Sequence, residues 1–203
     1  MPAPAKKQDR AILTRKQLTA AARQVFAHHG FEFARVEDIA AAAGKTRGAF
    51  YANFRDKEDV FFAIFEEDLA HDVEQVSLQL NEAASAEDRI GALALHLSSV
   101  IKDRPRMLLA LEFKQYAIRH PRRQKRLAEL HTAMCTRCME TDLNKLIPEF
   151  ACAQLDQKRT QSAQIGAILE GLALNRMFDR GSLSEEQLQK LIRANLRVAL
   201  GLE

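Results

Sequence analysis

The chain has 203 residues, of which 47% are hydrophobic and 28% charged, and its formal net charge is +3. This length allows one or two domains with a well-buried core. No apolar run approaches the ~20 residues of a membrane span, and no apolar stretch precedes Ile12, so we expect neither a membrane span nor a secretory leader. Three cysteines, an odd number, fit a reducing cytoplasm better than a disulfide framework.

Charge is unevenly distributed along the chain. Between Lys6 and Lys57 there are eleven Lys and Arg against five Asp and Glu, whereas ten acidic residues and one Arg lie between Glu58 and Ile90. A basic N-terminal part followed by an acidic segment indicates a nucleic-acid-binding surface confined to one end of the protein.

The N-terminal segment predicts a flexible arm and then a helix. Pro, Ala and charged residues dominate Met1–Ala11, which we expect to be the arm. Thr14 begins a capping-box pattern that starts the helix, and Gly30 ends it. Beyond it, Phe31 and Phe33 are expected to enter the core.

Two short helices are predicted next. The first covers Val36–Ala43 and ends at Gly44, which supplies the positive φ of a sharp turn. Thr46 can then cap a second helix over Arg47–Phe54. Two helices joined by a tight glycine turn form a helix-turn-helix outline.

The run D-I-A-x-x-A-G-x-T-R-G-A-F-Y-x-x-F-x-D-K-E-D, from Asp38 to Asp59, resembles the helix-turn-helix signature of the TetR/AcrR family of bacterial transcriptional regulators. The chain departs from the family pattern at Ala34 and Arg35, because the family usually has Thr or Ser just before the first motif helix. It also departs at Lys45, where the family usually has an apolar residue after the turn glycine. The resemblance implies that the first three helices bind DNA and the others bind an effector and a second subunit. Residues placed at the DNA surface are Arg35, Lys45, Thr46, Arg47, Gly48, Ala49, Tyr51, Asn53 and Lys57, the last matching a phosphate-binding Lys.

The chemistry of these residues agrees with such a surface. Thr46 and the neighbouring backbone N–H groups can hold a phosphate. Arg47 can donate to guanine or to phosphate, and Ala49 can touch a thymine methyl group. Phe50 and Phe54 are expected to point inward.

The rest of the chain predicts six more helices and no strand, which makes an all-α fold of about nine helices. They are expected over 56–83, from the cap at Ser85 to 102, and over 105–119, 121–146, 157–179 and 184–200. We place a DNA-binding domain at 1–56 and an effector-binding and dimerisation domain at 57–203. The long helix from 56 is the candidate for carrying a signal between them.

Flexible or bulky apolar side chains in the middle of the chain predict an effector pocket, although the same residues could simply form core. They are Leu97, Met107, Phe113, Tyr116, Met134 and Cys138. We therefore expect a small, largely apolar effector.

The last two helices predict a two-fold, four-helix dimer interface, because each combines an apolar stripe with small residues. The stripe residues are Ile165, Leu169, Leu172, Leu188, Ile192 and Leu196.

Other constellations carry weaker signals. Cys135 and Cys138 form C-x-x-C, for which packing on one helix face competes with thiol sensing and metal binding. His96 and His131 could face a cavity or be ordinary structural histidines. A second basic cluster could be a solvated face or attract an anionic ligand; it comprises Lys114, Arg119, Arg122, Arg123, Lys125 and Arg126.

We expect no enzyme, no cofactor and no metal, since catalytic and phosphate-loop motifs are missing from the sequence. The favoured hypothesis is a cytoplasmic, homodimeric repressor that an effector releases from a palindromic operator in double-stranded DNA. The alternative is a helical small-molecule-binding or adaptor protein without DNA binding, which would leave the basic N-terminal part unexplained.

Overall fold

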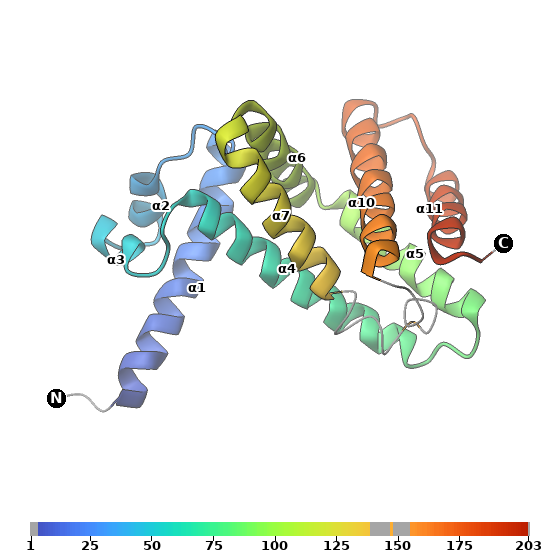
Figure 1. The fold of residues 1–203 in the computed structure, drawn as a ribbon, viewed down its shortest axis with the longest axis horizontal. Coiled ribbons are helices and arrows are strands. Elements are labelled where there is room, and N and C mark those ends of the chain that lie inside the picture. Colours follow the sequence, from blue (N-terminus) through green and yellow to red (C-terminus); the bar gives the residue numbers. More distant parts are fainter. Residues whose placement is uncertain (1–3, 139–146, 148–154, 203) are drawn as a thin grey trace.

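The computed structural model describes residues 4–138, 147 and 155–202, and these residues contain nine helices and no strand. The helices are α1 (Pro4–His29), α2 (Val36–Ala42), α3 (Arg47–Tyr51), α4 (Lys57–Leu80), α5 (Ala86–Lys102), α6 (Arg104–Arg119), α7 (Pro121–Cys138), α10 (Leu155–Phe178) and α11 (Glu185–Leu200). Figure 1 shows α1 to α3 at one end, α10 and α11 at the other, and α4 running between them. The all-α fold is confirmed.

Helix α1 is longer than the sequence predicted. It begins at Pro4, so the arm expected over Met1–Ala11 is helical from residue 4 onward, and Thr14 lies inside the helix rather than at its cap. Ala, Lys, Gln, Arg and Leu dominate this stretch, and all are good helix formers. Gly30 ends the helix with a φ of +75°, as expected.

Helix α4 links the two ends of the molecule. Asp56 caps it by accepting a hydrogen bond from the Asp59 backbone N–H at 2.8 Å. Its 24 residues correspond to a length of about 36 Å at 1.5 Å per residue. Ser85 and Ser184 form the capping boxes that start α5 and α11. Local signals therefore fixed these helix starts correctly.

Two hydrophobic clusters lie along α4. The first combines α1, α2 and α3 with the start of α4, with α6 and with Leu127 of α7. It includes Phe31, which is fully buried, whereas Phe33 is 78% exposed and does not enter the core as expected. The second joins the end of α4 to α5, α10 and α11. The first cluster is continuous across residues 56 and 57, where we placed the domain boundary.

Candidate nucleic-acid interface and ligand cavity

The start of α3 is fixed by its cap and by its buried face. Thr46 Oγ1 accepts a hydrogen bond from the Ala49 backbone N–H at 3.1 Å, which is the predicted N-cap. Phe50 and Phe54 are 0% and 2% exposed and anchor the helix, as predicted. Gly44 makes the preceding turn with a φ of +64°. These contacts hold the opposite face of α3 toward solvent.

That outer face carries the side chains expected at DNA. The side chain of Arg47 is 64% exposed, its Nη1 lies 3.0 Å from Glu37 Oε1, and its guanidinium lies over the Tyr51 ring at 5.4 Å. An exposed ion pair of this kind contributes little, so Glu37 orients Arg47 without making it unavailable to a phosphate or base. Thr46, Gly48 and Tyr51 are exposed, and Lys45 and Ala49 are half-buried.

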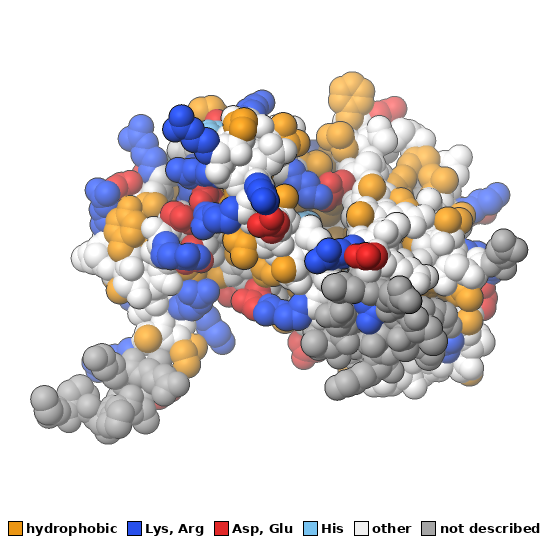
Figure 2. Space-filling model, in the orientation of Figure 1, with side chains coloured by type: hydrophobic (Ala, Val, Ile, Leu, Met, Phe, Trp, Pro, Cys, Tyr) orange, Lys and Arg blue, Asp and Glu red, His pale blue; other side chains and the backbone are white. Residues whose placement is uncertain are grey.

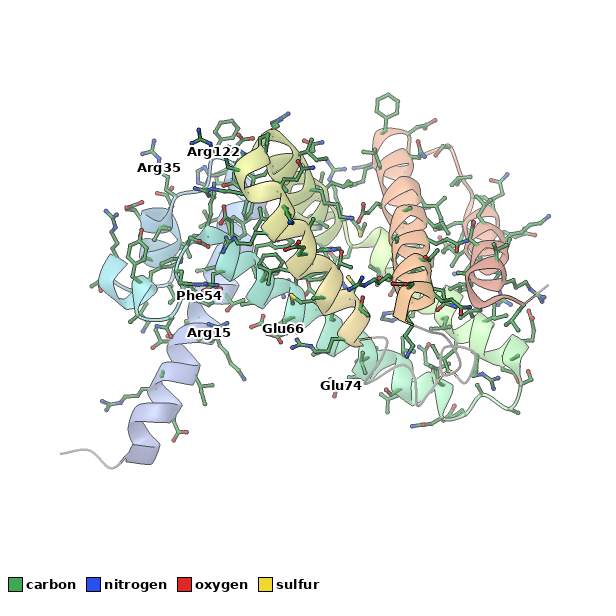
Figure 3. The ribbon with its side chains drawn as sticks, in the orientation of Figure 1. Arg15, Arg35, Phe54, Glu66, Glu74 and Arg122 are labelled. Carbon is green, nitrogen blue, oxygen red and sulfur yellow. The ribbon has the colours of Figure 1, made fainter. Side chains whose placement is uncertain are left out.

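Basic side chains surround α3. Figure 2 shows Lys and Arg gathered over the end of the molecule that holds α1 to α3 and the start of α7. Arg35 is exposed at the start of α2, where its side chain makes no cap hydrogen bond, and in Figure 3 it projects outward. The positive surface predicted from the sequence is therefore present in the fold.

Sequence reasoning missed Arg15 on α1. Its Nη1 donates to the Asn53 backbone oxygen at 3.0 Å, and its guanidinium lies 4.3 Å from the centroid of the Phe54 ring (Figure 3). Arg15 therefore ties α1 to the end of α3. Asn53 is half-buried, and its Nδ2 donates to the Ala49 carbonyl oxygen at 2.8 Å, so its amide nitrogen is engaged within the protein.

Lys57 is also placed differently from expectation. Its Nζ donates to the carbonyl oxygens of Phe31 and Glu32 at 2.8 and 2.5 Å, and it lies over the Phe31 and Tyr116 rings. Burial lowers the pKa of its ammonium group. The side chain thus holds the loop between α1 and α2, instead of pointing toward a phosphate as the resemblance implied.

The neighbouring Glu58 anchors part of the second basic cluster. Its carboxylate is 2% exposed, accepts from the Tyr116 hydroxyl at 2.7 Å and from Arg126 Nη2 at 2.9 Å, and contacts Arg123. Burial would raise the pKa of this carboxyl, but Tyr116 and the two arginines outweigh burial and lower it. Arg119 likewise pairs with Glu32 at 3.0 Å. Several members of the cluster therefore fasten α6 and α7 to the start of α4 and to the loop between α1 and α2.

A cavity of about 230 Å³ lies between α4, α5, α6, α7 and α10. Leu97 and Met107 line it, as predicted. Phe113 and Tyr116 do not; they belong to the N-terminal hydrophobic cluster, because α6 turns that face toward Phe31. Met134 is not among the described lining residues, and the side chain of Cys138 lies outside the described part of the structure.

Helix α4 supplies a wall of the cavity that the sequence did not predict. Phe61, Ile64, Phe65, Asp68, Leu69, Asp72, Val73 and Val76 all line it. Three acidic residues follow one another on this helix. Glu66 and Glu67 are 59% and 47% exposed, but the Asp68 side chain is only 17% exposed and lines the cavity.

One end of this apolar cavity is charged. Arg106 on α6 donates from Nη1 and Nη2 to the two carboxylate oxygens of Asp72 at 2.9 and 2.5 Å, and its Nε lies 3.6 Å from Asp68 Oδ2. Arg23 on α1 donates to Asp68 Oδ1 at 2.7 Å and to the Ile64 carbonyl oxygen at 3.2 Å. A carboxylate in the cavity wall therefore also contacts the first N-terminal helix.

His131 and Cys135 lie on α7, elsewhere in the cavity wall. The His131 ring stacks on Phe65, with 4.8 Å between centroids, and burial together with the charge of Lys114 lowers its pKa to about 4. Burial raises the pKa of the Cys135 thiol, which disfavours the reactive thiolate. The surroundings of Cys135 therefore favour ordinary packing over thiol sensing.

The predicted dimer residues divide between two other roles. Leu188, Ile192 and Leu196 are at most 3% exposed and belong to the core of a single subunit, so their placement at an interface was wrong. Ile165 and Leu169 line the cavity, and Leu172 packs partly buried against the same core. Helical spacing identified a buried stripe but could not say what buries it. The same two helices expose other apolar side chains, namely Leu174, Phe178, Leu191 and Val198.

Metal-binding clusters and membrane-spanning helices are both absent from the described residues. No group of three His, Cys, Asp or Glu side chains there could hold a metal ion. No helix in that part of the chain is both long and apolar enough to cross a membrane.

The sequence is similar to known regulators over its N-terminal part. The model of the family described as "Bacterial regulatory proteins, tetR family" matches residues 18–64. The HTH-type transcriptional repressor AcnR of Corynebacterium efficiens is 42% identical over 69 residues, 34% of this chain and 37% of that protein. The fatty acid metabolism regulator protein of Bacillus subtilis is 30% identical over 88 residues, 43% of this chain and 45% of that protein. The chain thus spans less than half the length of these curated relatives.

Solved structures extend the likeness in fold to almost the whole chain. A TetR-family regulator from Mesorhizobium loti superposes with a TM-score of 0.63 at 21% identity, covering 95% of this chain and 98% of the other. The regulator FadR of Bacillus subtilis, solved with stearoyl-CoA, has a TM-score of 0.60 at 18% identity, with coverages of 93% and 98%. At these identities the likeness shows the fold alone.

Proposed function

We propose that this chain is a transcriptional repressor of the tetR type, which binds operator DNA and is released by a small molecule. The match of residues 18–64 to the model of that family of bacterial regulatory proteins supports the proposal. The observation that carries this proposal is the exposed polar face of α3. Thr46, Arg47 and Tyr51 project from a short helix whose other face is fully buried, within a basic surface. The repressor would act in the cytoplasm, where bacterial DNA lies.

A homodimer is part of the proposal. Helices α1 to α3 of each subunit would form a DNA-binding head. Two such heads related by a two-fold axis would read inverted half-sites about one turn of the DNA helix apart, ~34–36 Å. The apolar side chains that α10 and α11 expose support pairing through these helices, in particular Leu174 at 53% and Phe178 at 92% exposure. Burying such side chains against a second copy would remove them from water.

The cavity supports the effector part of the proposal. Its wall is mostly apolar, and its volume of about 230 Å³ lies just below the ~300–1,000 Å³ common for ligand pockets, so a small or slender molecule fits it best. The effector would favour a subunit arrangement whose two heads no longer match the groove spacing. Operator DNA must then weaken effector binding by the same factor.

Fluorescence anisotropy with DNA from upstream of the gene tests DNA binding. Arg47→Ala should cost about 1–3 kcal/mol of binding free energy and relax sequence preference if the contact is to a base. Arg159→Ala on α10 is the matched control, because it removes the same charge from an exposed side chain far along the chain. If the wild type binds no such DNA, or if both variants bind as the wild type does, the proposal fails.

A further inference from the structure

His96 on α5 is a buried side chain with an unmet hydrogen-bonding group. Its side chain is 9% exposed and lines the cavity beside Arg106, Asp68 and Asp72. His96 Nε2 lies 3.2 Å from Asp72 Oδ1, but it has no partner in hydrogen-bonding geometry. Leaving a buried polar group without a partner costs roughly 1–3 kcal/mol.

The neighbouring carboxylate indicates what this nitrogen offers. The Asp72 carboxylate lies near Nε2 but out of line with it, so its negative charge favours the tautomer that carries hydrogen on Nε2 without accepting a hydrogen bond from that N–H group. His96 therefore presents an N–H donor that makes no hydrogen bond within the described part of the protein. An oxygen of a bound molecule is the simplest group to satisfy it.

The charges around this end of the cavity restrict the ligand further. Arg106 pairs with Asp72, and Arg23 pairs with Asp68, so two positive charges balance two negative ones. A ligand anion or cation would add a charge without a counterpart in a poorly solvated place, which is costly. A neutral polar group carries no such cost.

We propose that the cavity binds a small apolar molecule ending in a neutral oxygen, a hydroxyl or a carbonyl, which accepts a hydrogen bond from His96 Nε2. The hydrocarbon part lies along the apolar wall that includes Leu93, Leu97 and Met107. This inference deepens the proposed function, since it rests on the cavity being the effector site.

Asp68 places this ligand end next to the DNA-binding head. The same carboxylate lies 3.6 Å from Arg106 and accepts a hydrogen bond from Arg23 of α1. A ligand that changes how Arg106 is shared between Asp72 and Asp68 changes the contact that holds α1 against α4. Occupancy of the cavity thereby has a direct route to the first helix of the head.

Isothermal titration calorimetry on the full chain, without DNA, tests the ligand class with three probes of equal chain length: 1-octanol, octanoate and octylamine. The wild type should bind 1-octanol most tightly. His96→Leu should weaken 1-octanol binding about three- to tenfold, the equivalent of one hydrogen bond. His96→Gln keeps an N–H donor and should restore part of that loss. His71→Leu removes an exposed histidine from α4 and should change nothing.

A merely structural histidine gives a different pattern. Because His96→Leu removes an unpartnered donor, its melting temperature should equal or exceed that of the wild type. A lowered melting temperature with equal weakening of all three probes would overturn the assignment. So would tighter binding of octanoate or octylamine than of 1-octanol, or no binding of 1-octanol at all.

Because the titration needs no DNA, failure of the inference and failure of the proposed function are distinguishable. A wild type that binds operator without preferring 1-octanol refutes the ligand class alone. A wild type that prefers 1-octanol through His96 but binds no operator refutes the proposed DNA-binding function alone.

Discussion

Replacing Glu58 by Gln tests how α6 and α7 are fastened to the start of α4. The substitution keeps the side-chain volume but removes the charge from a carboxylate that is 2% exposed. Tyr116 donates to it at 2.7 Å and Arg126 at 2.9 Å, and Arg123 also contacts it. Glutamine can accept fewer of these hydrogen bonds and offers its own N–H group to an arginine.

The cost can be bounded from the exposure of the partners. Breaking a fully buried ion pair costs about 3–5 kcal/mol. Arg123 and Arg126 are 53% and 47% exposed, so water can solvate them after the change, and we expect a loss nearer ~2 kcal/mol, typical of a hydrogen bond to a charged group. In a chain of this size each kcal/mol lowers the melting temperature by about 2–4 °C, giving roughly 4–8 °C.

Differential scanning calorimetry measures this loss, and Glu66→Gln is the matched control. Glu66 lies on the same helix and pairs with Arg137 at 2.8 Å, but both side chains are about 60% exposed (Figure 3). Exposed pairs contribute only ~0–1 kcal/mol, so the control should shift the melting temperature by less than about 4 °C and by less than Glu58→Gln does. Equal shifts in the two variants would refute the reasoning.

The pH dependence adds a second check on Glu58. Its folded-state pKa is lowered below the ordinary value of 4.5, so the carboxylate stabilises the fold above pH 4.5. That contribution is lost as the pH falls from 4.5 through the folded-state pKa. The Glu58→Gln variant should therefore lose less stability than the wild type over that acid range.

Three further predictions use the same measurements. Lys57→Met should lower the free energy of unfolding in urea by about 1–3 kcal/mol, because it leaves the Phe31 and Glu32 carbonyl oxygens without their donor. It should leave the salt dependence of operator binding unchanged. A plot of log affinity against log salt that is shallower by about one unit per subunit, at unchanged stability, would instead indicate a phosphate contact. Leu174→Glu should produce monomers in light scattering, whereas Leu78→Glu, which charges a similarly exposed position on α4, should not; a dimeric Leu174→Glu would exclude this face. The pKa of His131 is lowered from 6.5 to about 4, so the unfolded chain takes up its proton first and the free energy of unfolding falls as the pH drops from 6.5 to 4. His131→Phe keeps an aromatic ring to stack on Phe65, and its free energy of unfolding in urea should fall less over this range. An unchanged pH dependence in the variant would contradict the lowered pKa.

The sequence predicted best what neighbouring residues determine. Thr46, Asp56, Ser85 and Ser184 cap the helices where their side chains can reach backbone N–H groups three residues on. Helix type and order follow from such local signals combined with apolar spacing. The arm before Thr14 was misjudged because its helix-forming residues were outweighed by its charge and its prolines.

Partners that are distant in sequence could not be predicted in this way. Asp68 and Asp72 look like solvated acids on α4 until α6 brings Arg106 against them. In the same way, Lys57 matches a phosphate-binding position by motif, but the loop between α1 and α2 places carbonyl oxygens within its reach. On α11, spacing marks Leu196 and Val198 alike as apolar, and only the packing shows that the first is 3% and the second 69% exposed.

The cavity and the N-terminal helices α1 to α3, the proposed DNA-binding head, are built on shared side chains, and this constrains how one can act on the other. Phe61 and Ile64 belong to the hydrophobic cluster that contains α1 to α3, and both also line the cavity. Phe61 stacks on Phe113 with centroids 3.6 Å apart and Phe31 packs edge-on against both rings, so few voids separate the cavity wall from the head.

Closely packed interiors transmit displacements rather than absorb them. A molecule entering the cavity therefore presses on the core on which α3 is built, and it does so beside the carboxylate that holds Arg23. Because the core is continuous across residues 56 and 57, the head cannot swing on a free hinge there. We expect effector binding to move α1 to α3 together with the start of α4, as one body, with a coupling free energy of the usual ~1–3 kcal/mol.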